Sequence, residues 1–176
     1  MIALHFDQEY VEDIARERGI SLEMLYYFEP TSTCQEKASL LAWSAQRIIK
    51  TLYFSDGDSP FIGFVTPEFG QPVLIKRILQ DQLGLSGKQA KRYQLGKRLP
   101  RGMEYGACTP FAHESSFREE IDGIIIADVP RLDDVIVDVS IGGKGDDAHM
   151  ASLHLPYRGI YQILAQQFGE KIYRDR

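Results

Sequence analysis

Residues 47–66 read RIIKTLYFSDGDSPFIGFVT, and this stretch indicates how the chain folds. Residues 47–54 and 61–66 are rich in β-branched and aromatic residues, which are typical of strands. The intervening SDGDSP contains the glycine, proline and aspartate residues that favour turns. The stretch therefore predicts a β-hairpin, with Lys50 lying among the apolar residues of its first strand.

Helices are expected on the amino-terminal side of this hairpin. Residues 7–18 place apolar side chains on one helical face, and residues 22–28 suggest a second, shorter helix. Thr33 and Glu36 have the spacing of a capping box, in which each side chain bonds the backbone N–H of the other residue. A third helix is therefore expected over residues 33–43, leading into the hairpin.

The rest of the chain mixes helices and strands without regular alternation. Helices are expected at residues 72–83, 86–95 and 157–168, and strands at residues 121–129, 134–141 and 151–155. This order predicts an α+β fold around a mixed or antiparallel β-sheet. A chain of 176 residues fits a single domain, which we assign to residues 20–176, with residues 1–19 as a helical extension.

Composition and charge exclude several classes of protein. The net charge of −5 argues against a nonspecific nucleic-acid binder, and no apolar run approaches the ~20 residues that span a bilayer. The amino-terminal residues lack the pattern of a signal peptide. Cys34 and Cys108 are far apart and form no CxxC pair, so neither a disulfide framework nor a zinc site is expected. We therefore expect a soluble cytoplasmic protein without a metal or cofactor.

Basic residues gather in one part of this acidic chain. Residues 76–101 contain eight basic residues and a single acid, Asp81. Two interpretations fit this pattern: a solvated helix face, or a surface that contacts phosphate groups. Lys50 also has two interpretations. A lysine on an edge strand prevents aggregation, whereas a lysine in a cleft binds a phosphate, carboxylate or ester oxygen.

Two segments that contain glycine are candidates for ligand binding. Residues 106–110, GACTP, combine a glycine that lets the backbone approach a ligand with a proline that restricts the next turn. The N–H groups of such a loop can point at an oxygen, as in an oxyanion hole. Cys108 lacks the histidine and aspartate spacing of thiol proteases, so it is not expected to be a nucleophile. The Gly142–Gly143 turn lacks the GK[ST] ending of a phosphate loop, and His149 after it fits either a pocket mouth or an ordinary surface position.

Five sequence blocks, taken in order, resemble one protein family. The first block is the capped helix that leads into IIKTL with Lys50, and the second is the return strand followed by a helix with Lys76. The third is the GxxxP loop followed by Phe111. The fourth is the strand that ends at Asp128, and the fifth is Gly142–Gly143 followed by His149. Over about residues 20–170 the chain resembles the YbaK/ProX-type aminoacyl-tRNA deacylases. This family includes the editing domain inserted in bacterial prolyl-tRNA synthetases.

The resemblance implies a barrel-like sheet with surrounding helices and an enzyme that hydrolyses the ester bond of mischarged aminoacyl-tRNA, without a metal or cofactor. Its partners would be the acceptor end of aminoacyl-tRNA and, as a further expectation, an aminoacyl-tRNA synthetase. The implied catalytic residues are Lys50, Gly106 and His149. The implied substrate-binding residues are Ala107, Cys108, Thr109, Pro110, Asp128, Gly142 and Gly143. The implied tRNA contacts are Lys76, Lys88, Lys91 and Arg92.

The implied reaction is an editing step that protects the fidelity of translation. Such a deacylase selects by size, because a small pocket excludes the larger cognate side chain. Two alternatives stay open. The chain could be a noncatalytic protein of the same fold that binds tRNA or a synthetase, or a hydrolase of another small ester or nucleotide.

Overall fold

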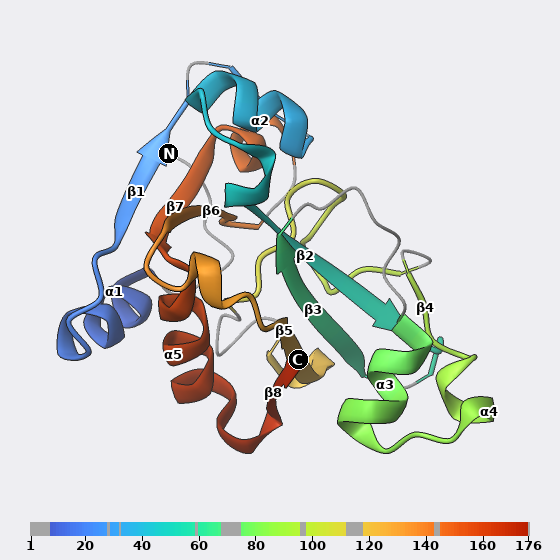
Figure 1. The fold of residues 1–176 in the computed structure, drawn as a ribbon. Coiled ribbons are helices and arrows are strands. Elements are labelled where there is room, and N and C mark those ends of the chain that lie inside the picture. Colours follow the sequence, from blue (N-terminus) through green and yellow to red (C-terminus); the bar gives the residue numbers. More distant parts are fainter. Residues whose placement is uncertain are drawn as a thin grey trace.

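The computed structural model describes residues 8–27, 29–31, 33–58, 60–67, 75–95, 98–111, 118–142 and 145–175 of the chain. These residues form one mixed sheet with helices packed around it (Figure 1). The helices are α1 (Gln8–Glu17), α2 (Cys34–Leu41), α3 (Ile75–Leu83), α4 (Gly87–Ala90) and α5 (Tyr157–Phe168). The strands are β1 (Glu23–Tyr26), β2 (Ile48–Ser55), β3 (Phe61–Pro67), β4 (Gln94–Leu95), β5 (Ile121–Ala127), β6 (Ile136–Ser140), β7 (Ala151–Pro156) and β8 (Ile172–Asp175).

The sheet combines parallel and antiparallel pairs. Its strand order is β1-β7-β6-β2-β3-β5-β8, and β4 pairs with the end of β2. The β2–β3 hairpin is antiparallel and sets Lys50 opposite Thr66. β2 pairs with β6, β3 with β5 and β5 with β8 in parallel, whereas β7 is antiparallel to both β1 and β6. The expected α+β fold with a mixed sheet is therefore confirmed.

Strands β6 and β7 have two chemically different faces. Because strand side chains alternate, Val137 and Val139 point to one face and Asp138 and Ser140 to the other. The apolar face of these strands is fully buried in the main core, together with residues from α5 and α1. The polar face meets α2. A second, smaller core lies where α3 packs against β2, β3 and β5.

Several local predictions are confirmed. The hairpin forms over Ile48–Ser55 and Phe61–Pro67, close to the expected bounds. Helix α2 begins after Thr33 with both hydrogen bonds of the capping box, at 3.1 Å each. Helix α5 spans Tyr157–Phe168 as expected and follows Pro156. These features depend on residues that are neighbours in sequence, which explains why their patterns were sufficient.

Two predicted helices are wrong in whole or in part. Residues 22–28 were expected to be helical, but Glu23–Tyr26 form strand β1, because they pair with residues 151–154 of β7. The helix expected over residues 86–95 is shorter and ends at Ala90, since Gln94 and Leu95 pair with the end of β2. Strand β8 was not predicted. In each case a partner that is distant in sequence overrides the local preference.

Helix α1 packs on the apolar core. Val11, Ile14 and Ala15 are buried, and Val11 and Ile14 belong to the main core cluster. The division between residues 1–19 and 20–176 stays a prediction. Among the described residues, no helix is both long enough and apolar enough to cross a membrane.

Candidate functional site

A cavity of about 560 Å³ lies where strands β2 and β6 separate. The two strands pair at Ile48–Asp138 and Ile49–Val139, and β4 pairs with β2 only at Phe54 and Ser55. Between these points, residues 50–53 have a strand partner on the β3 side alone within the described parts of the chain. Residues 48–52 of β2 line the cavity beside this opening.

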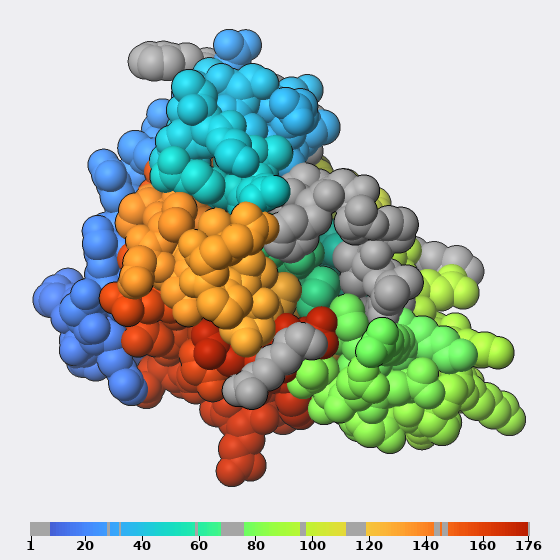
Figure 2. Space-filling model, viewed as in Figure 1, coloured from blue at the N-terminus to red at the C-terminus, as the bar shows by residue number. Residues whose placement is uncertain are grey.

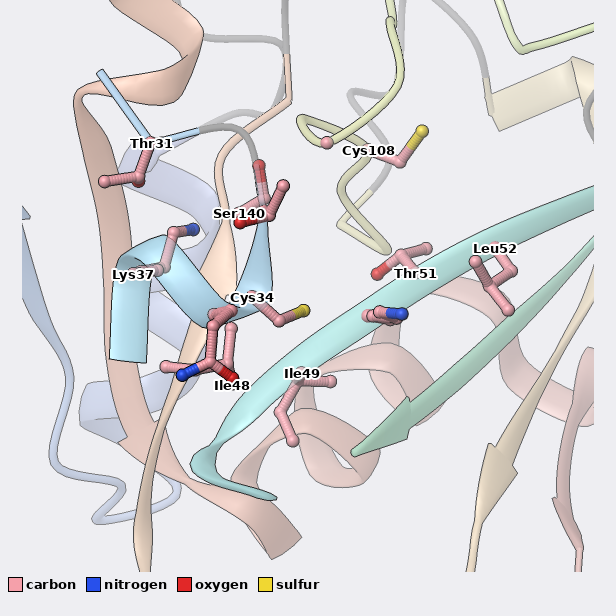
Figure 3. Close-up of a pocket in the computed structure, with 13 residues that line it drawn as sticks. Thr31, Cys34, Lys37, Ile48, Ile49, Thr51, Leu52, Cys108 and Ser140 are labelled. Atoms are coloured by element: carbon pink, nitrogen blue, oxygen red, sulfur yellow. The ribbon is translucent and has the colours of Figure 1, made fainter. Parts of the chain in front are cut away.

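Four parts of the chain surround this cavity (Figure 3). Residues 48–52 of β2 form one wall, and the start of α2 forms another. Gly106 and Cys108, from the loop between β4 and β5, form the third. Ser140 contributes from the end of β6. Residues far apart in sequence therefore converge on one hollow.

Lys50 is a lining residue of this cavity, as the cleft interpretation expected. The alternative of an edge strand is wrong, since β2 lies between β6 and β3 in the sheet. Lys50 nevertheless occurs where one side of β2 is open. An interior strand with a local gap in its pairing thus supplies a lysine to a cavity.

A buried polar layer connects α2 to β6 and β7. The Nζ atom of Lys37 lies 3.0 Å from Oδ1 of Asp138 and donates a hydrogen bond of 3.1 Å to Oγ of Ser152. Oδ2 of Asp138 accepts hydrogen bonds from the Tyr27 hydroxyl and, at 2.8 Å, from Nε2 of His154. Asp138 is completely buried, so each of these donors compensates for its lost hydration.

The surroundings of this layer keep Asp138 ionised. Burial alone raises the pKa of Asp138, but the hydrogen bond from His154 and the charge of Lys37 outweigh it and lower the pKa. Burial and the charge of Asp138 raise the pKa of Tyr27, which therefore acts as a neutral donor. The Trp43 and His154 ring centres lie 4.7 Å apart with the rings tilted by 36°, and the Arg47 guanidinium lies 3.5 Å from the Trp43 ring centre. These contacts fix the orientation of the histidine.

Hydrogen bonds to Glu104 and Tyr53 stabilise the loop at residues 106–110. Gly106 has a φ of 80°, a left-handed conformation that favours glycine. The N–H of Ala107 donates to the carbonyl of Glu104 at 3.1 Å. The hydroxyl of Tyr53 donates to the carbonyl of Thr109 at 2.6 Å, linking the loop to β2. Ala107, Thr109 and Pro110 are buried, so Gly106 and Cys108 are the parts of this loop that line the cavity.

Both cysteines line the cavity, and both are protonated thiols. Burial raises the pKa of Cys108 to about 12. Burial also raises the pKa of Cys34, although the charges of Lys50 and Lys37 act in the opposite direction. A thiolate is the nucleophilic form of cysteine, so neither residue is activated for covalent catalysis. This agrees with the expectation for Cys108.

His149 lies beside the loop and outside the set of described residues that line the cavity. Its Nε2 atom lies 2.6 Å from Oε1 of Glu104, and its Nδ1 lies 3.2 Å from the carbonyl of Thr31. The N–H of Gly145 also donates to Oε1 of Glu104, at 3.1 Å. His149 thus connects the segment before α2 to the loop that carries Gly106.

The other expected substrate-binding residues lie around the cavity or apart from it. Gly142 is buried just beyond Ser140, with a φ of 78°. Asp128 follows β5, where its N–H donates to the carbonyl of Asp175 at 2.7 Å, and it is outside the described cavity lining. Gly143 lies outside the described residues.

The expected tRNA contacts lie at the other end of β2. Lys76, Lys88, Lys91 and Arg92 are all exposed, on α3 and α4 and just after α4. β4 joins this region to Phe54 and Ser55, whereas the cavity involves residues 48–52. Figure 2 shows α3 and α4, in green, as a lobe at the side of the molecule away from α2.

The buried layer beneath α2 was not predicted as part of the site. Lys37, Asp138, His154 and Tyr27 come from four separate segments, and their meeting depends on the tertiary fold. One signal was present in the strand sequence IVDVS. Asp138 is a charged residue among apolar neighbours, and it lies on the face that the alternation of side chains turns away from the main core.

Comparison with solved structures identifies proteins of similar architecture. The hypothetical protein APE2540 has a TM-score of 0.59 and 20% identity, over 94% of this chain and 97% of that protein. A proposed trans-editing enzyme for prolyl tRNA synthetase has a TM-score of 0.59 and 15% identity, over 94% of both chains. The chain has the fold of these proteins.

A third structure shares this fold and extends the comparison. It comes from a computational design study of epitope grafting onto scaffold proteins, with a TM-score of 0.59 and 14% identity over 95% of this chain and 93% of that one. No family model and no curated protein matches the sequence. At these identities the structures establish the shared fold alone.

Proposed function

We propose that this chain is a YbaK/ProX-type deacylase that hydrolyses the ester bond of mischarged aminoacyl-tRNA in trans, acting on small aminoacyl groups in the cytoplasm. The observation that carries the proposal is that Lys50 and Gly106 line the same cavity. These are two of the three residues that the family resemblance implied as catalytic. The trans-editing assignment of one protein with the same fold is consistent with this function.

In this proposal Lys50 holds the 3′ end of the tRNA through a phosphate or ribose oxygen. Its compact charge suits a single oxygen contact. The loop at residues 106–110 positions the ester carbonyl, with backbone N–H groups near the oxygen that becomes negative. Water adds to the carbonyl carbon, and the ribose oxygen leaves with a proton. The protonated state of Cys108 supports water, rather than a thiolate, as the attacking group.

The remaining implied residues act through position. His149 joins Thr31 to Glu104 and thereby sets the spacing between α2 and the loop. Gly142 allows the turn after β6, close to Ser140 of the cavity wall. Asp128 and Gly143 are proposed to shape the outer part of the aminoacyl pocket. A cavity of about 560 Å³ also has to admit the terminal ribose, which favours small acyl groups.

A deacylation panel tests this function. The purified protein is incubated with tRNAs mischarged with alanine, cysteine, serine or a larger residue, and loss of the ester is followed. We expect rapid hydrolysis of one small aminoacyl ester, and a decrease of about a hundredfold or more for Lys50→Ala. Lys171→Ala is the matched control, because Lys171 is exposed and pairs with Asp122 at 3.4 Å.

The outcomes separate the candidate functions. Full activity of Lys50→Ala would contradict the assigned chemistry. Salt-dependent tRNA binding without release of any amino acid would instead identify a noncatalytic binding protein. Turnover of small esters or nucleotides in the absence of tRNA would identify a different hydrolase.

A further inference from the structure

The buried layer beneath α2 contains charged groups that the proposed reaction does not use. The side chain of Lys37 is 8% exposed, and Asp138 is completely buried. A buried ion pair is weak as a stabilising element, because apolar residues of similar volume often stabilise a protein equally well. Its location at a cavity wall suggests a role in binding.

The ammonium group of Lys37 has at least one N–H without an acceptor among the described residues. An ammonium group carries three donors. Ser152 accepts one hydrogen bond at 3.1 Å, the Asp138 carboxylate lies 3.0 Å away as an ion-pair partner, and no other partner of Nζ occurs among the described residues. Since Lys37 also lines the cavity, its remaining donor can bond a ligand there.

The charges around the cavity favour an anion. Lys37 and Lys50 both lower the pKa of the Cys34 thiol, whereas burial and the charge of Asp138 raise it, so two positive charges and one negative charge act on this part of the cavity. Two other donors, Tyr27 and His154, share the carboxylate that faces Lys37. The described lining contains no aspartate or glutamate.

Neutral donors support the same conclusion. Thr33, Cys34 and Gln35 line the cavity at the start of α2, where the helix dipole favours negative charge and Glu36 of the capping box already supplies one. Thr51 lines the cavity from β2 and is 8% exposed, and its hydroxyl oxygen has no hydrogen-bond partner among the described residues. Figure 3 shows the Cys34 thiol pointing from α2 toward the strand that carries Thr51.

We propose that Lys37 and Lys50 together bind an oxyanion of the ligand, a phosphate or a carboxylate, at the α2 wall of the cavity. Lys37 is a second recognition residue, and Asp138 is a positioning residue that acts through it. Only the origin of the oxyanion rests on the proposed function: it belongs to the terminal nucleotide or to the acyl group. Two cations repel a protonated amine, so the amino group of an aminoacyl ester lies away from this wall.

Calorimetric titration with inorganic phosphate, AMP and acetate at constant ionic strength tests the site. The test variant is Lys37→Gln combined with Asp138→Asn, which removes both charges and retains amide donors and acceptors in the buried layer. We expect its phosphate affinity to be about tenfold lower, because one charged hydrogen bond is lost. Lys171→Gln, the exposed control, should bind phosphate like the wild type.

The three probes distinguish the sources of the oxyanion. Tighter binding of AMP than of phosphate, lost in the double variant, supports a nucleotide phosphate. Binding of acetate that depends on Lys37 supports a carboxylate of the acyl group. Unchanged phosphate affinity in the folded double variant overturns the proposal, as does failure of the wild type to bind any of the three probes.

A measurement on the wild type covers the case in which the double variant does not fold. Phosphate should slow alkylation of Cys34, whose thiol is subject to the charges of both lysines, and chloride at the same ionic strength should not. Equal alkylation rates in both salts overturn the proposal.

The deacylation panel separates this inference from the proposed function. If the protein hydrolyses the ester but its phosphate affinity does not depend on Lys37, the inference is refuted and the proposed function is not. Phosphate binding that requires Lys37 in a protein that hydrolyses no ester refutes the function alone. If both hold, the double variant should raise KM for aminoacyl-tRNA more than it lowers kcat, because Lys37 contacts the bound ligand in both the ground state and the transition state.

Discussion

The ammonium group of Lys37 lies 3.0 Å from Oδ1 of Asp138, and both side chains are buried between α2 and the sheet. Each charge depends on the other for the interactions it lost on leaving water. Breaking such a pair from one side is therefore more harmful than removing both charges.

Asp138→Asn should destabilise the protein by about 3–5 kcal/mol, because it leaves the Lys37 charge buried without an ionic partner. Chemical denaturation gives the free energy of unfolding. The double variant Lys37→Gln with Asp138→Asn is the comparison, and it should lose less stability than the single variant. A loss below about 1 kcal/mol for Asp138→Asn would show that the pair is relaxed by water or by movement of α2.

The contribution of Asp138 to stability should depend on pH. Its pKa is lowered in the folded protein, so its stabilisation is complete above the unfolded value of about 3.9 and decreases as the pH falls through the lower folded value. The difference in unfolding free energy between wild type and Asp138→Asn should therefore be smaller at about pH 3 than at pH 7. Asp134→Asn, at an exposed position, is the control. A difference that stays constant over this range would contradict the assignment.

Elements that depend on neighbouring residues could be predicted from the sequence, whereas strands that depend on a distant partner could not. The hairpin, the capping box of α2 and the start of α5 depend on neighbouring residues, so local patterns predicted them. Strand β1 resembles a helix in its residues because its strand conformation comes from pairing with β7. Strands β4 and β8 are short, and each has a partner far away in sequence.

The candidate site shows the same division. Lys50 was identifiable as a charge within an apolar strand, and residues 106–110 as a glycine–proline loop. The buried layer was not, because a lysine on a helix, a tyrosine and a histidine are each common on surfaces. Only the fold brings Lys37, Asp138 and His154 within bonding distance.

Tyr53→Phe should weaken the attachment of the loop at residues 106–110. The buried hydroxyl donates at 2.6 Å to the carbonyl of Thr109, and its removal leaves that acceptor without this partner. We expect a loss of about 1–3 kcal/mol in the free energy of unfolding. Tyr161→Phe is the matched control, since Tyr161 is half-buried and contacts Arg174 through its ring face. Equal effects of the two variants would argue against a structural role for the Tyr53 bond.

Replacing Lys88 and Lys91 by glutamine should weaken tRNA binding if the basic lobe contacts the nucleic acid. Each lost phosphate contact reduces the slope of log K against log salt by about one unit. Filter binding at several salt concentrations measures both effects. Arg16→Gln on α1 is the control, because Figure 1 shows α1 and α4 on opposite sides of the molecule. A double variant with the wild-type salt slope would indicate that the lobe is a solvated surface only.

The alternation of side chains along β6 and β7 also protects the chain while it folds. Valines 137 and 139 face the main core, and Asp138 and Ser140 face α2. A shift of one residue in the pairing of these strands would reverse both faces. Asp138 would then enter the apolar core without its ion-pair partner and its two hydrogen-bond donors, and the valines would meet the charge of Lys37. Incorrect pairing of these strands is thus strongly disfavoured. The Asp138 carboxylate, which pairs with Lys37 of α2 in the folded protein, also disfavours the shifted register during folding.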